Sequence, residues 1–270
     1  MRKLFVAAIA AAVAVTGFAV IANAGKGEAG TSLDLALKPK KVDKAAGMDV
    51  VFEPTKVDDQ GTADTSDDVY TPTDKNTIRL PRKSSVDTKA RKRCKLTPSE
   101  VGQGQNCPKK TRLGAGSTVT FVGGQPLADE KRQGGVPLNG TIEVYNLEED
   151  LLLVVQSCQP GTGPTTDNEC VPASQRVVLT GAWRKVATWP KLVVETPSSL
   201  HANGIVITRL ELNVDKHTKT VKVGGKEVLR AFLLTPETCG GKWKSQVKTN
   251  FTDGTKQTIV DKQKCKKPVS

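Results

Sequence analysis

The chain contains only two histidines, which limits the nucleophilic chemistry that it could carry out. His201 lies in the segment SSLHANG and His217 in DKHTKT, and both segments are typical of polar turns. A serine-type hydrolase needs a nucleophile, a histidine base and an acid that orients the histidine. Ser198 and Ser199 stand near His201, but neither lies in the G-x-S-x-G pattern of a nucleophile elbow. We therefore assign no catalytic residue.

Acidic side chains gather at two places. Glu148, Glu149 and Asp150 lie in YNLEED, where paired carboxylates could hydrolyse glycosides, although a charged turn between two strands is the simpler interpretation. A second group surrounds Gly61 without the spacing of an EF-hand loop, and it comprises Asp58, Asp59, Asp64, Asp67 and Asp68. We predict no metal site and no cofactor. A secreted hydrolase with a carboxylate-based site stays open as an alternative.

The six cysteines indicate disulfide chemistry. They are Cys94, Cys107, Cys158, Cys170, Cys239 and Cys265. All of them follow a predicted export signal, and disulfides persist in oxidising compartments. Six cysteines allow fifteen pairings, of which proximity along the chain favours Cys94 with Cys107, Cys158 with Cys170 and Cys239 with Cys265. No CxxC motif is present, so we do not expect these cysteines to bind a metal.

Basic side chains crowd both sides of the first predicted disulfide. This predicted basic patch comprises Lys89, Arg91, Lys92, Arg93, Lys95, Lys109, Lys110 and Arg112. A second basic group near the last disulfide comprises Lys242, Lys244, Lys262, Lys264, Lys266 and Lys267. Two interpretations stay open: a solvated lysine-rich surface, or a salt-sensitive site for anionic cell-wall polymer, lipid headgroups or a surface protein. We expect no nucleic-acid binding, because no known module is present and few aromatic residues lie between the charges.

The first 24 residues have the parts of a secretory signal. Arg2 and Lys3 precede an apolar stretch, and a small-x-small motif ends at Ala24, which we predict as the last residue removed. An uncleaved anchor is the alternative, since the apolar stretch is just long enough to span a bilayer. The residue immediately after Ala24 is glycine and not the cysteine that a lipoprotein needs, so we expect no lipid anchor and no stable membrane anchor after cleavage. The predicted location is the cell envelope or the extracellular medium.

Short β-branched runs separated by turn residues fill most of the remaining chain. The predicted strands are 48–53, 77–80, 118–122, 138–145, 151–155, 176–180, 191–195, 206–214, 228–234, 243–252 and 255–260. The segment 206–215 alternates as a strand with one buried face should, whereas 151–155 is continuously apolar and should be central, covered on both sides. The dipeptides at 224–225 and 253–254, Gly-Gly and Asp-Gly, predict hairpin turns.

No amphipathic helix longer than a turn or two and no internal repeat is visible, so we predict an all-β fold. The expected architecture is a disulfide-stabilised antiparallel β-sandwich, either jelly-roll-like or Ig-like. We divide the chain into a signal peptide (1–24), a flexible leader or linker with one short strand at 33–37 (25–47), and a single domain (48–266). Only 4% of the residues are aromatic, which argues against a sugar-binding platform.

The order of several features is distinctive. Leu80-Pro81 is followed by Cys94, Cys107-Pro108 and the run Leu113-Gly114-Ala115-Gly116, and then by Thr235-Pro236, Cys239, Trp243, Phe251-Thr252-Asp253-Gly254 and Cys265. This layout resembles a group of secreted bacterial all-β proteins without an assigned activity. The resemblance implies export, a β-sandwich and the pairings Cys94 with Cys107 and Cys239 with Cys265. It implies no catalytic residue.

These observations favour a basic, non-enzymatic protein of the envelope or extracellular medium. Its net charge of +12 makes a basic face the leading candidate for contact with anionic surface polymers or a partner protein. An apolar ligand carrier, with a cavity between the two sheets, is the further alternative.

Overall fold

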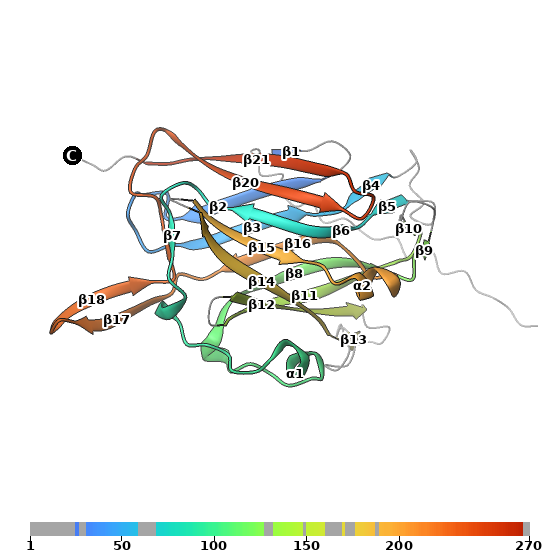
Figure 1. The fold of residues 1–270 in the computed structure, drawn as a ribbon, viewed down its shortest axis with the longest axis horizontal. Coiled ribbons are helices and arrows are strands. Elements are labelled where there is room, and N and C mark those ends of the chain that lie inside the picture. Colours follow the sequence, from blue (N-terminus) through green and yellow to red (C-terminus); the bar gives the residue numbers. More distant parts are fainter. Residues whose placement is uncertain are drawn as a thin grey trace, which may run out of the picture.

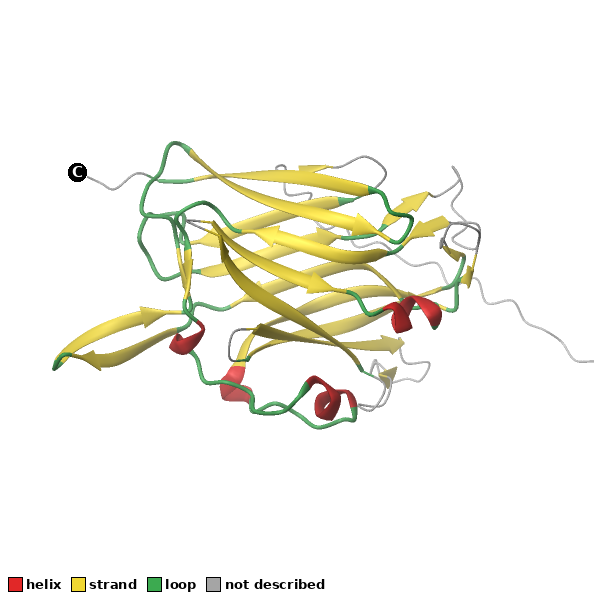
Figure 2. Ribbon diagram, viewed as in Figure 1, coloured by secondary structure: helices red, strands yellow, loops and turns green. Residues whose placement is uncertain are grey.

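The computed structural model describes residues 25–26, 31–58, 69–126, 132–147, 150–159, 169–170, 176–186 and 189–266. Antiparallel strands make up most of these residues, which confirms the predicted all-β class (Figure 2). No helix in these ranges is both long and apolar enough to cross a membrane. The predicted cleavage site at Ala24 lies outside the described residues, as do Glu148, Glu149 and the acids at 59–68.

The largest sheet has thirteen strands, twelve of which lie on one continuous antiparallel path. In spatial order the path runs through β1 (Gly25–Lys26), β2 (Ser32–Lys38), β3 (Gly47–Glu53), β16 (Val206–Val214), β8 (Arg112–Val122), β11 (Val136–Asn146), β12 (Asp150–Gln159), β14 (Val177–Val186), β15 (Trp189–Glu195), β6 (Thr73–Arg79), β20 (Lys242–Phe251) and β21 (Lys256–Lys264), while β13 (Glu169–Cys170) pairs with β12 off the path. The path curves back, so that β21 contacts β1 and β2 (Figure 1). The layers expected of a sandwich are therefore opposite walls of one nearly closed sheet.

Side chains of β21 join the two ends of this sheet. The Asp261 carboxylate accepts a hydrogen bond from the backbone N–H of Leu35 (3.2 Å). The Gln263 amide accepts from the N–H of Leu37 (2.9 Å) and donates to the carbonyl of the same residue (2.8 Å). These bonds replace part of the backbone ladder that two neighbouring strands would form. We refer to this junction of β2 and β21 as the seam.

Three smaller sheets and a few short helical turns complete the fold. One sheet contains β4 (Lys56–Asp58), β5 (Val69–Thr71), β10 (Arg132–Gln133) and β9 (Gln125–Pro126); β17 (Thr218–Val223) pairs with β18 (Lys226–Ala231), and β19 (Leu233–Leu234) with β7 (Ser85–Val86). The helical elements are η2 (Thr88–Ala90), α1 (Pro98–Gly102), η3 (Lys109–Thr111) and α2 (Ser198–Ala202). The predicted hairpins are confirmed: β17–β18 turns at Gly224-Gly225 and β20–β21 at Asp253-Gly254.

Strand β12 is buried on both faces, as its continuous apolar run predicts. Leu151, Leu153 and Val155 face the interior of the nearly closed sheet. Leu152 and Val154 belong to a second cluster with the two cysteines of the first disulfide and a residue of α1. The segment closed by that disulfide therefore covers the outer face of the sheet at β12.

The N-terminal part of the chain corrects one prediction. Residues 25–47 are not simply a leader, because they contain β2, whose Leu33, Leu35 and Leu37 are at most 1% exposed. The alternation of SLDLALK provides a buried face, but that face becomes useful only when β3 and the distant β21 lie beside it. The short strand considered at 33–37 is thus an integral part of the main sheet.

Strand β16 departs from strict alternation at one point. Its register against β8 shifts between Ile207 and Arg209, so Thr208 is an extra residue in a bulge. Val206 and Val214 are buried as predicted, and Leu210 and Leu212 pack partly buried against the core. Because of the bulge, Ile207 also reaches the interior.

Two of the predicted disulfides are present. Cys94 bonds to Cys107 and Cys239 to Cys265, with Cα separations of 5.5 and 5.9 Å. The side chains of Cys158 and Cys170 lie outside the description, so their bond stays a prediction. The strand register nevertheless places their Cα atoms directly opposite each other.

Candidate functional site

Seven cationic side chains line one open concavity on the protein surface, which we name the basic groove. Its volume is about 490 Å³. The lining residues are Lys89, Arg91, Lys92, Arg93, Lys95, Lys110 and Lys219. Among the described residues no acidic side chain contributes to this lining, so these cations lie close together and repel each other in the free protein.

A short, tightly held segment positions the first five of these cations. Asp87 caps η2 by accepting a hydrogen bond from the N–H of Lys89 (3.0 Å). The chain then runs through the cationic residues to Cys94, whose disulfide to Cys107 brings η3 and Lys110 to the same place. The first disulfide therefore merges two basic segments that lie more than a dozen residues apart.

Asn146, the last residue of β11, holds this cationic segment against the sheet. Its side chain is fully buried, and its Nδ2 lies 2.8 Å from the carbonyl of Thr88, 3.1 Å from that of Arg91 and 3.4 Å from that of Lys92. The backbone N–H of Cys94 in turn donates to the carbonyl of Asn146 (2.8 Å). One residue thus fixes a whole loop that carries several positive charges.

Six of the eight residues of the predicted basic patch line the groove. Lys109 does not line it, although it is exposed. The guanidinium of Arg112 is turned to Glu143 (Nη1 to Oε1, 2.8 Å), whose other carboxylate oxygen accepts from the hydroxyl of Tyr145 (2.7 Å). This hydrogen-bonded pairing lowers the pKa of Glu143 and raises that of Arg112, against the opposing effect of burial. Arg112 therefore supports the sheet and does not contribute to the groove.

Arg91 and His217 lie close together at the edge of the groove. The Nη2 of Arg91 donates to the carbonyl of Arg112 (3.1 Å), while its Nε is buried without a hydrogen-bond partner among the described residues. His217 lies at the start of β17, where burial and the charge of Arg91 lower its pKa, although a hydrogen bond to the carbonyl of Leu113 (2.8 Å) opposes the shift.

Lys219 is the groove residue that the sequence did not reveal. It comes from β17, more than a hundred residues after Lys110, and no local pattern connects the two. Four members of the second lysine group lie elsewhere, on β20 and β21, where Lys242 faces Lys264 and Lys244 faces Lys262 across the hairpin. Lys266 follows β21, and Lys267 lies outside the described residues.

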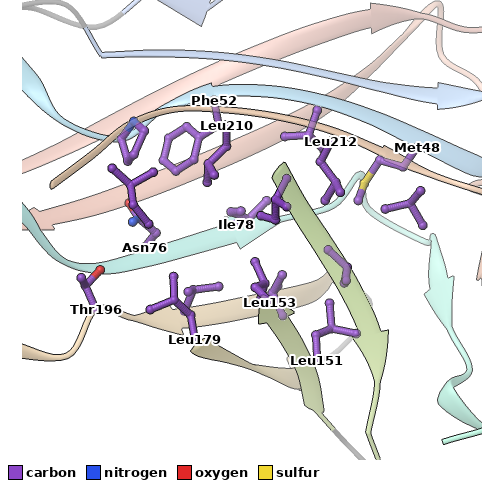
Figure 3. A pocket seen from close by; sticks show the side chains of 18 of the residues that line it. Met48, Phe52, Asn76, Ile78, Leu151, Leu153, Leu179, Thr196, Leu210 and Leu212 are labelled. Carbon is purple, nitrogen blue, oxygen red and sulfur yellow. The ribbon is translucent and has the colours of Figure 1, made fainter. Parts of the chain in front are cut away.

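A second candidate site is an apolar cavity of about 100 Å³ inside the nearly closed sheet. Its walls come from β3, β6, β11, β12, β14, β15 and β16, among other elements. Figure 3 shows Asn76 and Thr196 at one end and Met48 at the other. His201, Thr55 and Thr73 also contribute to the lining, so the cavity contains a few polar groups in an otherwise apolar wall. The apolar-carrier alternative expected a cavity between two sheets, whereas this cavity lies between opposite walls of one sheet.

The carboxylates of two described acids have raised pKa values. Asp34 and Asp261 have pKa values raised mainly by burial, and each is close to a further carboxylate, Asp49 for the former and Asp34 for the latter. Both lie at the seam, where Asp261 accepts backbone hydrogen bonds, and neither lines the groove or the cavity. Within the described ranges, no three side chains of His, Cys, Asp or Glu come together as a metal site.

Comparison with known proteins does not assign a function to either candidate site. The sequence matches no protein-family model and no curated protein sequence. The resemblance based on the order of cysteines and turns thus stays a prediction.

Proposed function

We propose that the protein is a non-enzymatic binding protein that acts outside the cytoplasm and holds a polyanionic, phosphate-rich ligand in the basic groove. The observation that carries the proposal is the lining of seven lysine and arginine side chains, with no acid among the described residues that form it. Gathering like charges on one rigid surface opposes folding, and an anionic ligand would relieve that repulsion. The two disulfides suit an oxidising, extracytoplasmic compartment.

The cations of the groove are carried by an anchored backbone, which favours a binding site over a merely charged surface. The cationic loop is fixed by the first disulfide and by the Asn146 side chain. Cations held in place lose little conformational freedom when they bind, which favours affinity. A solvated lysine-rich surface, the competing interpretation, needs neither a concave shape nor anchored backbone.

The test is binding of long-chain inorganic polyphosphate to the purified protein, measured by titration calorimetry. In the groove variant, Lys92→Gln, Lys95→Gln and Lys110→Gln remove three exposed cations. The control variant, Lys244→Gln, Lys248→Gln and Lys262→Gln, removes the same charge from the exposed surface of β20 and β21.

We expect the groove variant to lose at least tenfold in affinity, because it lacks three direct phosphate contacts. The control variant should lose much less. Equal losses in the two variants would mean that net charge alone attracts the polymer, and the proposal would then be wrong.

A second candidate function is binding of a small apolar molecule inside the sheet, as the cavity favours. An engineered apolar cavity of about 150 Å³ binds benzene, so a ligand of similar or smaller size is expected here. Benzene should raise the melting temperature of the protein, and Val144→Phe, which extends a ring from the cavity wall, should abolish that effect. An unchanged melting temperature in benzene would contradict this candidate.

A further inference from the structure

The hairpin of β17 and β18 projects from the body with apolar side chains exposed on it. We name residues 218–231 the arm. Within the described part of the chain its two strands pair only with each other (Figure 1). Three of the four large hydrophobic side chains exposed in the described residues belong to the arm: Val223 (52% exposed), Val228 (42%) and Leu229 (64%). Isolated exposed hydrophobics are common, but such a concentration on one projecting element marks an interaction surface.

The strand register arranges these side chains in a defined way. Val221 lies directly opposite Val228, and Val223 lies opposite Lys226. Because alternate residues of a strand share a face, the three valines lie on one face, while Leu229 lies on the other. A two-stranded hairpin has no interior in which to bury such residues. Its apolar surface can only be covered by something outside the arm.

The charge of the arm limits what that partner can be. Lys219, Lys222, Lys226 and Arg230 outnumber Glu227, its one acid. Two copies of the arm would therefore repel each other, which disfavours self-association. A partner must offer negative charge together with an apolar environment.

The root of the arm lies beside the basic groove. Lys219 lines the groove, and Arg230 is 3.8 Å from Asp87, the residue that caps the cationic segment. The backbone N–H of Phe232 donates to the carbonyl of His217 (2.9 Å), which joins the two ends of the arm. Arm and groove therefore form one continuous basic surface with an apolar extension.

We propose that this surface docks on an anionic lipid bilayer. The arm enters the interfacial region by its end, so that Val223 and Val228 on one face and Leu229 on the other are all inserted, and the cations of the arm and groove meet lipid phosphates. This inference rests on the proposed function, because the groove supplies many of the cations. A water-soluble polyanion would match the charges but leave the apolar side chains in water, whereas a bilayer accommodates both.

The test measures flotation of the protein with phosphatidylcholine vesicles that contain or lack 30% phosphatidylglycerol. In the arm variant, Val223→Thr, Val228→Thr and Leu229→Thr keep the charge and use a residue that favours strands. The control is Val260→Thr, which alters the fourth exposed hydrophobic residue, on β21. Each protein is also titrated with inorganic polyphosphate.

We expect the wild-type protein to float with anionic vesicles only, and the arm variant to partition at least tenfold less, because it has lost buried apolar area. The Val260→Thr control should partition as the wild type does. The affinity of the arm variant for polyphosphate should stay within about twofold of wild type, which would show an intact fold and groove. In addition, Leu229→Trp should give a blue-shifted fluorescence with anionic vesicles but not with polyphosphate.

The results separate the inference from the proposed function. Binding to polyphosphate without binding to anionic vesicles, equal partitioning of arm variant and wild type, or equal binding to neutral vesicles would each overturn bilayer docking and leave the polyanion site intact. Binding to neither probe would overturn both proposals.

Discussion

Asn146 is the residue on which the geometry of the groove depends most. Its side-chain Nδ2 lies within 3.4 Å of three backbone carbonyl oxygens of the cationic segment, and its backbone carbonyl accepts a hydrogen bond from the N–H of Cys94. We predict that Asn146→Ala lowers the free energy of unfolding by about 2–3 kcal/mol, because three partly buried carbonyls lose their donor. Urea denaturation measures this loss.

The matched control for that change is Asn213→Ala. Asn213 donates to Asp49 at the protein surface, so its loss should cost less than about 0.5 kcal/mol. Asn146→Asp should be at least as harmful as Asn146→Ala at neutral pH, because a carboxylate would then face three carbonyl oxygens. An Asn146→Ala variant as stable as wild type would show that the segment is held by the disulfide alone.

Asp34 allows a prediction of pH dependence. Burial raises its pKa, and the nearby Asp49 carboxylate adds to the shift, while Lys40 partly offsets it. An acid whose pKa is higher in the folded state destabilises that state as pH rises from the unfolded pKa of about 4 through the folded value. At pH 7 the penalty is fully present, and near pH 3 it is absent.

We therefore expect Asp34→Asn to raise the melting temperature at pH 7 by about 1–3 °C and to have no effect near pH 3. Asp74→Asn removes the same charge from an exposed position and should have little effect at either pH. Melting curves across this range, followed by circular dichroism, provide the measurement. A gain for Asp34→Asn that is as large at pH 3 as at pH 7 would rule out the electrostatic explanation.

The sequence could not predict every residue of the groove. Six of its cations lie in two clusters that flank neighbouring cysteines, so a local disulfide was enough to bring them together. Lys219 reaches the groove only because β17 folds back beside η2, a relation that depends on the whole fold. In the same way, the sequence placed Arg112 in the basic patch because it lies in the right segment. It could not reveal that Arg112 pairs with Glu143, which lies on the neighbouring strand.

At the scale of elements, the seam determines whether the main sheet closes. Gln263 makes both a donor and an acceptor bond to the backbone of Leu37. We predict that Gln263→Ala lowers the free energy of unfolding by about 1–2 kcal/mol, because part of the edge of β2 loses its partners. Lys262→Ala, an exposed position on the same strand, should change it by less than about 0.5 kcal/mol. Urea denaturation compares the two, and equal effects would mean that the seam adds no stability.

Local patterns predicted most strands but not how the sheet ends meet. The Gly-Gly and Asp-Gly turns and the apolar run of β12 are signals contained within a few residues, and the structure confirms them. Strand β2 was underestimated because its charged surroundings indicate a leader, and its burial depends on residues 226 positions away. Such non-local pairing leaves no trace in periodicity.

At the scale of the whole molecule, the disulfide-linked segment, the groove and the arm form one positively charged surface next to a rigid sheet. The apolar cavity lies inside that sheet and is separate from this surface. In our proposal this surface binds the ligand and the sheet provides stability, while the cavity is a second, independent candidate site.

The salt dependence of polyphosphate binding tests the central claim most directly, because it counts the cations that engage the ligand. A plot of log affinity against log salt concentration should have a negative slope in the wild-type protein. Relative to wild type, the slope should become shallower by about 2 in the variant that lacks Lys92, Lys95 and Lys110, since each phosphate contact contributes about 0.7. The variant altered at Lys244, Lys248 and Lys262 should keep the wild-type slope. The same slope in all three proteins would contradict the assignment of the groove as the binding site.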